Sequence, residues 1–98
     1  MNKWILTQNG ELVNLRHIVK FYISDKTCSI YGITGQKNED GRNVSIKIIS
    51  PVPDNMRLTE ENQDFYEMKC GMLLETIIKF LDNDKILLDM TQITDTIN

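Results

Sequence analysis

The sequence contains few of the residues that build metal sites, disulfide frameworks or phosphate-binding loops. It has two cysteines, Cys28 and Cys70, which form no C-x-x-C pair, and one histidine, His17. Zinc normally takes four nitrogen or sulfur ligands, so we expect no metal and two reduced, buried thiols. A glycine-rich loop of the G-x-x-x-x-G-K or G-x-G-x-x-G type is also missing. We therefore expect no cofactor.

The chain also lacks a long apolar run and an excess of positive charge. No run reaches the roughly 18 residues that a membrane span needs, so we expect a cytoplasmic protein with no membrane partner. A net charge of -3 offers little to neutralise phosphates, so we expect no direct binding to DNA or RNA. His17 has no acidic or thiol partner at a spacing that implies a shared site. The sequence therefore predicts a protein that is not an enzyme.

What is present is typical of a globular domain, because 41% of the 98 residues are apolar and 26% are charged. We expect a single domain over residues 1–98, with a sheet over residues 3–49. Apolar residues there recur with period two and turn residues interrupt them. The predicted strands are 3–7, 11–14, 18–24, 27–34 and 43–49, with a single turn at 15–17.

After Pro51 and Pro53 the apolar period changes to 3.6, which predicts a helix from about 59 to 82. Gly71 leaves two alternatives open, one continuous helix or two helices bent at that residue. A last strand is predicted at about 85–91, followed by a frayed tail from Gln92. The predicted apolar face of the helix consists of Phe65, Tyr66, Met72, Leu73, Ile77, Phe80 and Leu81.

These elements predict an α+β fold, a curved and mainly antiparallel sheet of about five or six strands packed against one long C-terminal helix. A half barrel like that of pleckstrin-homology domains is a candidate form. Ile77 and Phe80 lie at the centre of the apolar face, so we expect them to anchor the helix on the sheet. Their expected neighbours are Phe21, Ile46 and Ile48.

The opening, Trp4-Ile5-Leu6-Thr7 followed by Gly10 and Leu12-Val13-Asn14-Leu15, is a hairpin signature. It resembles small uncharacterised bacterial and phage proteins that begin with W-I-x-T, a turn glycine and L-V-N-L. The resemblance covers about the first fifth of the chain. It implies a small domain of sheet and helix, and it implies no activity.

Most of the negative charge falls in the predicted helix, where residues 60–82 carry about -4 by the count of charged side chains. We expect a non-enzymatic protein-interaction module of bacterial or phage origin, a monomer or homodimer, whose acidic stripe docks on a protein with a basic surface. A sharper form of this hypothesis is an inhibitor of a host protein. The predicted stripe consists of Glu60, Asp64, Glu67 and Glu75.

Two alternatives remain open. The first is a small-ligand-binding domain with a pocket between sheet and helix, because aromatic and methionine side chains often line such pockets. The second is a partner surface on the strand side, around Trp4, Tyr31 and the loop 35–42. The predicted pocket residues are Tyr22, Tyr31, Tyr66 and Met72.

Overall fold

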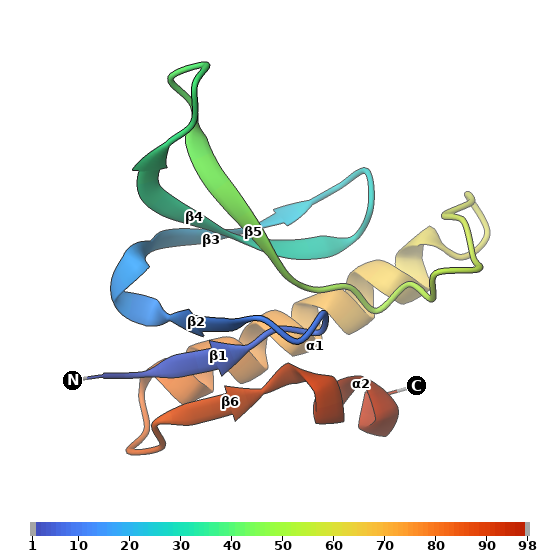
Figure 1. Cartoon of the computed structure of the whole chain (residues 1–98). Coiled ribbons are helices and arrows are strands. Elements are labelled where there is room, and N and C mark those ends of the chain that lie inside the picture. Colours follow the sequence, from blue (N-terminus) through green and yellow to red (C-terminus); the bar gives the residue numbers. More distant parts are fainter. Residues whose placement is uncertain (1, 98) are drawn as a thin grey trace.

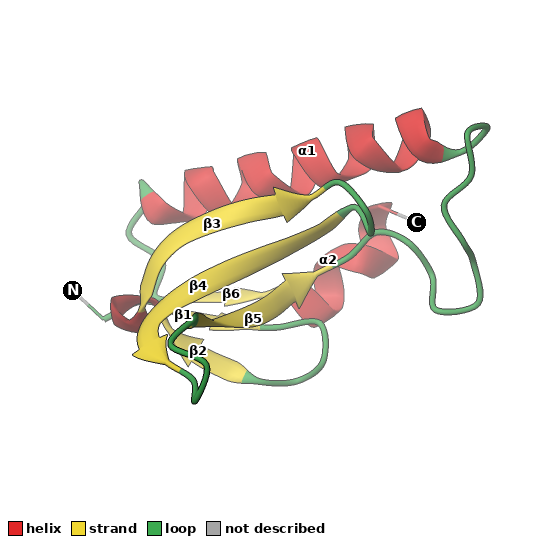
Figure 2. Ribbon diagram, turned by 90° about the horizontal axis from the view of Figure 1, so that it is seen from above, coloured by secondary structure: helices red, strands yellow, loops and turns green. Residues whose placement is uncertain are grey.

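In residues 2–97, which the structure describes, six strands form two three-stranded sheets and a long helix runs along one side of both (Figures 1 and 2). The structure is a computed structural model, and side chains are described through residue 93. In chain order the elements are β1 (Trp4–Leu6), β2 (Leu12–Asn14), the 3-10 turn η1 (Leu15–His17), β3 (Ile18–Ser24), β4 (Ser29–Lys37), β5 (Asn43–Ile49), α1 (Gln63–Leu81), β6 (Leu87–Asp89) and α2 (Met90–Ile97).

The first sheet has the order β2-β1-β6 and joins segments that are far apart in the sequence. β1 and β2 form an antiparallel hairpin in which Ile5 lies opposite Val13. Its turn contains Gly10 at φ 87°, a left-handed conformation that glycine adopts without steric cost. β6 pairs in parallel with the other edge of β1, with Leu88 opposite Ile5. β2 is therefore an edge strand.

The second sheet is an antiparallel meander of order β3-β4-β5. Ile30 of β4 lies opposite Ile23 of β3 and Ile49 of β5, and all three belong to the core or pack against it. Because side chains alternate along a strand, Tyr31 and its partner Tyr22 lie on the opposite, outer face. One face of this sheet is therefore buried and the other is open to solvent.

The core lies where α1 meets both sheets. Leu73, Ile77 and Phe80 follow the i, i+4, i+7 spacing of one helix face, and each is at most 2% exposed. They pack with residues of both sheets and of α2, which confirms the prediction that Ile77 and Phe80 anchor the helix. The core cluster is Ile5, Ile30, Ile48, Ile49, Cys70, Leu73, Ile77, Phe80 and Met90, with Phe21 and Ile46 among the partly buried residues packed against it.

The prediction of a single curved sheet is wrong. The strand positions were close, and β3 and β5 match the predicted 18–24 and 43–49. However, η1 turns the chain between β2 and β3. The edge of β1 that does not face β2 pairs with β6, and not with a strand of the second sheet. Alternation reports only which side chains share a face, so it does not reveal which strands pair.

The C-terminal region also differs from the prediction. The last strand is three residues long rather than spanning 85–91, and the segment from Met90 to Ile97 is α2 instead of a frayed tail. Met90 is fully buried in the core, which ties the start of α2 to the molecule. α1 continues through Gly71 without a break. Within residues 2–97 no helix has both the length and the apolar character needed to cross a membrane.

Candidate functional site

The predicted acidic stripe lies partly on α1. Asp64, Glu67 and Glu75 are exposed helix residues, whereas Glu60 precedes the first residue of the helix, Gln63. The Gln63 side chain donates a hydrogen bond of 3.0 Å to Glu67. This bond holds the Glu67 carboxylate against the first turn of the helix.

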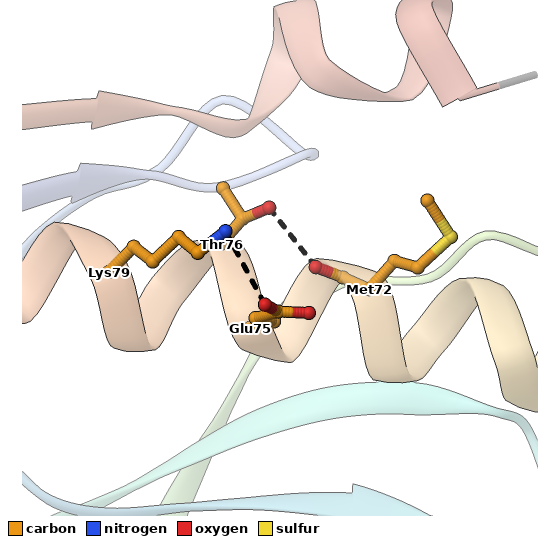
Figure 3. Close-up of polar contacts among 4 residues, drawn as sticks. All are labelled: Met72, Glu75, Thr76 and Lys79. Atoms are coloured by element: carbon orange, nitrogen blue, oxygen red, sulfur yellow. Dashed lines mark hydrogen bonds and ion pairs between the residues drawn. The ribbon is translucent and has the colours of Figure 1, made fainter.

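The outer face of α1 is apolar as well as acidic. Met68 and Met72 are 60% and 51% exposed, and Met68 lies at the i+4 position from Asp64 on the same side of the helix. Figure 3 shows the Lys79 ammonium reaching the Glu75 carboxylate, with 3.3 Å between nitrogen and oxygen. This contact neutralises one stripe residue locally. The face is a mixed surface rather than a continuous acidic one.

The four residues of the predicted ligand pocket do not come together. Tyr22 and Tyr31 stack with their ring centroids 5.4 Å apart on the outer face of the second sheet. Tyr66 is buried on α1, and its hydroxyl donates to the Met56 sulfur over 2.8 Å. Met72 is exposed on another side of the same helix. The space between the second sheet and α1 is filled by the core.

A cleft of about 510 Å³ instead lies between the two sheets, next to the β2 edge. Its walls come from the strands β1 to β5, from the turn between β1 and β2 and from η1. This volume falls within the range of about 300–1,000 Å³ that is usual for ligand sites. The lining residues are Trp4, Glu11, Leu12, Val13, Asn14, Arg16, His17, Val19, Thr34, Gly35, Gln36 and Ile46.

The backbone of β2 offers unused pairing positions to this cleft. The Thr7 amide donates to the Glu11 carbonyl and the Leu15 amide donates to the Lys3 carbonyl, at 2.7 and 2.9 Å. Since antiparallel partners bond at every second residue, the amide and carbonyl groups of Leu12 point away from β1, as do those of Asn14. Both residues line the cleft. An added strand would find its hydrogen-bonding groups there.

The cleft also carries large apolar side chains that are open to solvent. Leu12 is 59% exposed and Val19 is 65% exposed, while Trp4 is half-buried beside them. Edge strands commonly carry charge, proline or a bulge that discourages pairing, and β2 itself, Leu12-Val13-Asn14, has none of these. Nothing in β2 itself therefore discourages another strand from pairing with this edge.

η1 gives one end of the cleft its charge. The Asn14 side chain accepts a hydrogen bond of 3.0 Å from the Arg16 amide, which fixes the turn that carries Arg16 and His17. Both side chains are exposed, and Glu11 supplies an opposite charge near the hairpin turn. A bound segment would thus meet a cationic end and an anionic end.

Sequence reasoning missed most of this site. Of the alternative surface predicted around Trp4, Tyr31 and residues 35–42, the cleft contains Trp4, Gly35 and Gln36 but not Tyr31. Gly35 and Gln36 belong to β4, so the predicted loop begins later, after Lys37. Leu12 and Val19 were overlooked because period-two alternation does not distinguish an edge strand from a central one. His17 has no acidic or thiol partner that the sequence indicates, and the tertiary structure places it in the same cleft as Trp4. The available signal was Leu12, an apolar residue directly before Val13 in a short predicted strand, because two adjacent apolar residues cannot both face one core.

The described residues do not form a metal-binding arrangement, since no three His, Cys, Asp or Glu side chains among them are grouped closely enough. Cys28 and Cys70 are free and buried. Burial raises the pKa of the Cys70 thiol to about 11, with a smaller contribution from Cys28. Neither thiol lines the cleft.

Comparisons with protein-family models, curated proteins and solved structures found no match. The candidate site is therefore argued from its geometry alone.

Proposed function

We propose that this protein is a non-enzymatic interaction module that binds an extended segment of another protein along the free edge of β2. The observation that carries the proposal is the position of the cleft, which runs past four consecutive residues of the β2 region, Glu11 to Asn14. Strand addition of this kind draws affinity from backbone hydrogen bonds and specificity from alternate side chains.

The side chains around the cleft favour a particular kind of segment. Trp4, Leu12 and Val19 offer apolar contacts, so alternate residues of the partner should be apolar. Arg16 and His17 lie at one end, so an acidic residue or a carboxyl terminus should lie there. The occupant is therefore an extended apolar segment with one acidic end.

Docking of a basic protein on the acidic residues of α1 remains a second proposal. It is supported by the charge distribution, because residues 60–98 contain nine Asp or Glu against three Lys or Arg. Asp64 and Glu67 are exposed. Charge of this kind would raise the association rate more than the affinity. The two proposals use different surfaces and can be separated by mapping.

The first test identifies and maps a bound segment. Random peptides displayed on phage are selected against the full chain, and the selected peptides are then titrated while Trp4 emission and backbone amide exchange are recorded. The amides of Leu12 and Asn14 should gain protection, because they point toward the added strand, whereas the Val13 amide is already paired with β1. Protection confined to Asp64 and Glu67 would instead favour the acidic surface.

A substitution in the edge strand makes the test decisive. Leu12→Pro removes the outward amide while leaving the inward ladder bonds, since proline is tolerated on strand edges. We expect a loss of at least about tenfold in peptide affinity, which corresponds to about 1.4 kcal/mol. Leu87→Pro, at an outward position on the opposite edge of the same sheet, is the matched control and should bind normally. Equal binding by both folded variants would contradict strand addition.

A further inference from the structure

A second pocket, at the opposite end of the meander from the β4–β5 turn, gathers positive charge. It has a volume of about 330 Å³ and lies between the β3–β4 turn and the segment that follows β5. Lys26, Lys47 and Arg57 each line it, from the turn, from β5 and from the following segment. The other lining residues are Thr27, Ser29, Ser50, Val52, Pro53, Asp54, Met56 and Leu58.

The three cations outnumber the acids of the pocket. Asp54 is the one carboxylate among its lining residues, which leaves a net charge of about +2. Within residues 2–97, no salt bridge joins Lys26, Lys47 or Arg57 to a carboxylate. Their charges are therefore available to a ligand. The whole-chain charge of -3 conceals this concentration.

Hydrogen bonds hold the walls of the pocket in place. The Ser50 amide donates to the Gln8 side chain over 2.9 Å, and the Ser50 hydroxyl accepts from the Val52 amide over 3.3 Å. On the other wall, the Asn62 side chain donates to the Arg57 carbonyl over 3.0 Å. A site whose walls are fixed loses less conformational freedom when a ligand binds.

An aromatic surface lies next to these charges. Lys47 lies opposite Tyr31 in the β4–β5 register, and Tyr31 stacks on Tyr22 with an interplanar angle of 17°. Cross-strand partners on one face are close neighbours, with Cβ atoms about 5 Å apart. Lys47 lines the pocket and lies opposite Tyr31, so it connects the pocket to the two stacked rings on the outer face of the meander. Tyr22 and Tyr31 are half-buried. Cationic side chains bind phosphates, and aromatic rings beside them stack on bases.

We propose that this surface binds a nucleotide, with its phosphate in the pocket of Lys26, Lys47 and Arg57 and its base against Tyr31. The site is separate from the β2 cleft, so it does not depend on the proposed peptide-binding function. The nucleotide can be free or part of a single-stranded nucleic acid, since both carry the same phosphate and base. The experiment distinguishes these two sources.

The test titrates the full chain with inorganic phosphate, adenosine monophosphate and a short oligothymidylate, using calorimetry and amide chemical shifts. We expect adenosine monophosphate to bind about tenfold more tightly than phosphate, because a stacked base adds roughly 1–3 kcal/mol. Tyr31→Ala should remove this advantage and leave phosphate binding unchanged. An oligothymidylate affinity far above that of the mononucleotide, with steep salt dependence, would identify single strands as the ligand.

Charge variants decide whether the pocket itself is responsible. Lys47→Gln and Arg57→Gln should each weaken binding about tenfold, as loss of a charge-assisted hydrogen bond predicts. Asp54→Asn should strengthen binding, since it removes a repelling carboxylate. Lys37→Gln, on an exposed residue at the end of β4 outside the pocket, is the matched control. The proposal would be overturned if adenosine monophosphate showed no saturable binding. It would also be overturned if Lys37→Gln and Arg57→Gln, both at exposed residues, weakened that binding equally.

Discussion

Lys3 is a buried lysine whose ammonium group is bound entirely by backbone carbonyls. Its Nζ donates hydrogen bonds to the carbonyls of Phe80, Asn83 and Lys85, at 2.7, 2.6 and 2.7 Å. It also lies 4.4 Å from the centroid of the Phe80 ring. The Phe80 carbonyl lies in the last turn of α1, where carbonyls carry partial negative charge that a cation stabilises, whereas Asn83 and Lys85 belong to the segment after the helix. Lys3 therefore joins β1 to the end of α1.

Substitution of Lys3 by methionine should destabilise the protein. Methionine keeps an apolar stem of similar length but removes the donor of three hydrogen bonds, so we expect a loss of about 2–4 kcal/mol in the free energy of unfolding. Urea denaturation measures this change. Lys20→Met, at an exposed position on β3, is the control and should change stability by less than about 0.5 kcal/mol. Similar midpoints for the two variants would show that the Lys3 bonds contribute little.

The two thiols should react slowly in the native protein and lower its stability at high pH. Burial raises the pKa of Cys70 to about 11 and also raises that of Cys28. At pH 8 about one Cys70 in a thousand is then a thiolate, which is the reactive form. Iodoacetamide should therefore label the native thiols far more slowly than the urea-unfolded ones.

The same pKa shifts fix the direction of the pH effect. The unfolded thiols ionise near the ordinary pKa of 9.0 and the folded Cys70 only near 11, so the unfolded state loses its protons first. The free energy of unfolding should fall as pH rises from about 9 to 11. A double Cys→Ser variant provides the reference curve. Rapid native labelling at pH 8 would mean that the thiols are accessible.

At the scale of single elements, α1 shows which part of an amphipathic pattern the sequence could predict. Leu73, Ile77 and Phe80 lie at the centre of the apolar arc and are buried as expected. Phe65, Met72 and Leu81 lie at its borders and are 45–51% exposed, which corrects their predicted place on the packed face. Only the part of a helix surface that neighbouring elements cover is buried. For α1 that part is determined by the position of the two sheets and not by the sequence of the helix.

A pair of phenylalanine substitutions on α1 tests this assignment. Phe80 is 2% exposed and Phe65 is 49% exposed, so the same chemical change removes very different amounts of buried surface. Phe80→Ala should cost about 3–5 kcal/mol in unfolding free energy. Phe65→Ala should cost about 1 kcal/mol or less, from its ring contacts with Tyr66 and Lys69. Comparable losses would place Phe65 in the core.

For the whole molecule, Gln8 links the two sheets. Its side chain donates to the Ser50 carbonyl over 3.1 Å and accepts from the Ser50 amide over 2.9 Å. Its own amide donates to the Ile48 carbonyl over 2.9 Å. These bonds connect the turn after β1 to the end of β5, and they therefore join the first sheet to the second.

Removal of the Gln8 side chain should weaken this junction. Gln8→Ala should reduce the free energy of unfolding by about 1–2 kcal/mol, because the two bonds to Ser50 are lost. Gln8→Glu keeps the acceptor and loses the donor, so its urea denaturation midpoint should lie between those of the wild type and Gln8→Ala. Gln36→Ala, an exposed glutamine of β4, provides the control. An unchanged Gln8→Ala midpoint would show that the sheets are held together by the core alone.

The sequence by itself determined the local elements, because alternation and the 3.6 period are properties of neighbouring residues. β3, β5 and most of α1 follow directly from these patterns. Tertiary structure alone decided the division into two sheets, the β2 edge, the basic pocket and the bonds of Lys3. Each depends on partners that are distant in the sequence, such as Lys3 and Lys85, 82 residues apart. Periodicity specifies the face on which a side chain lies and not the partner that covers it.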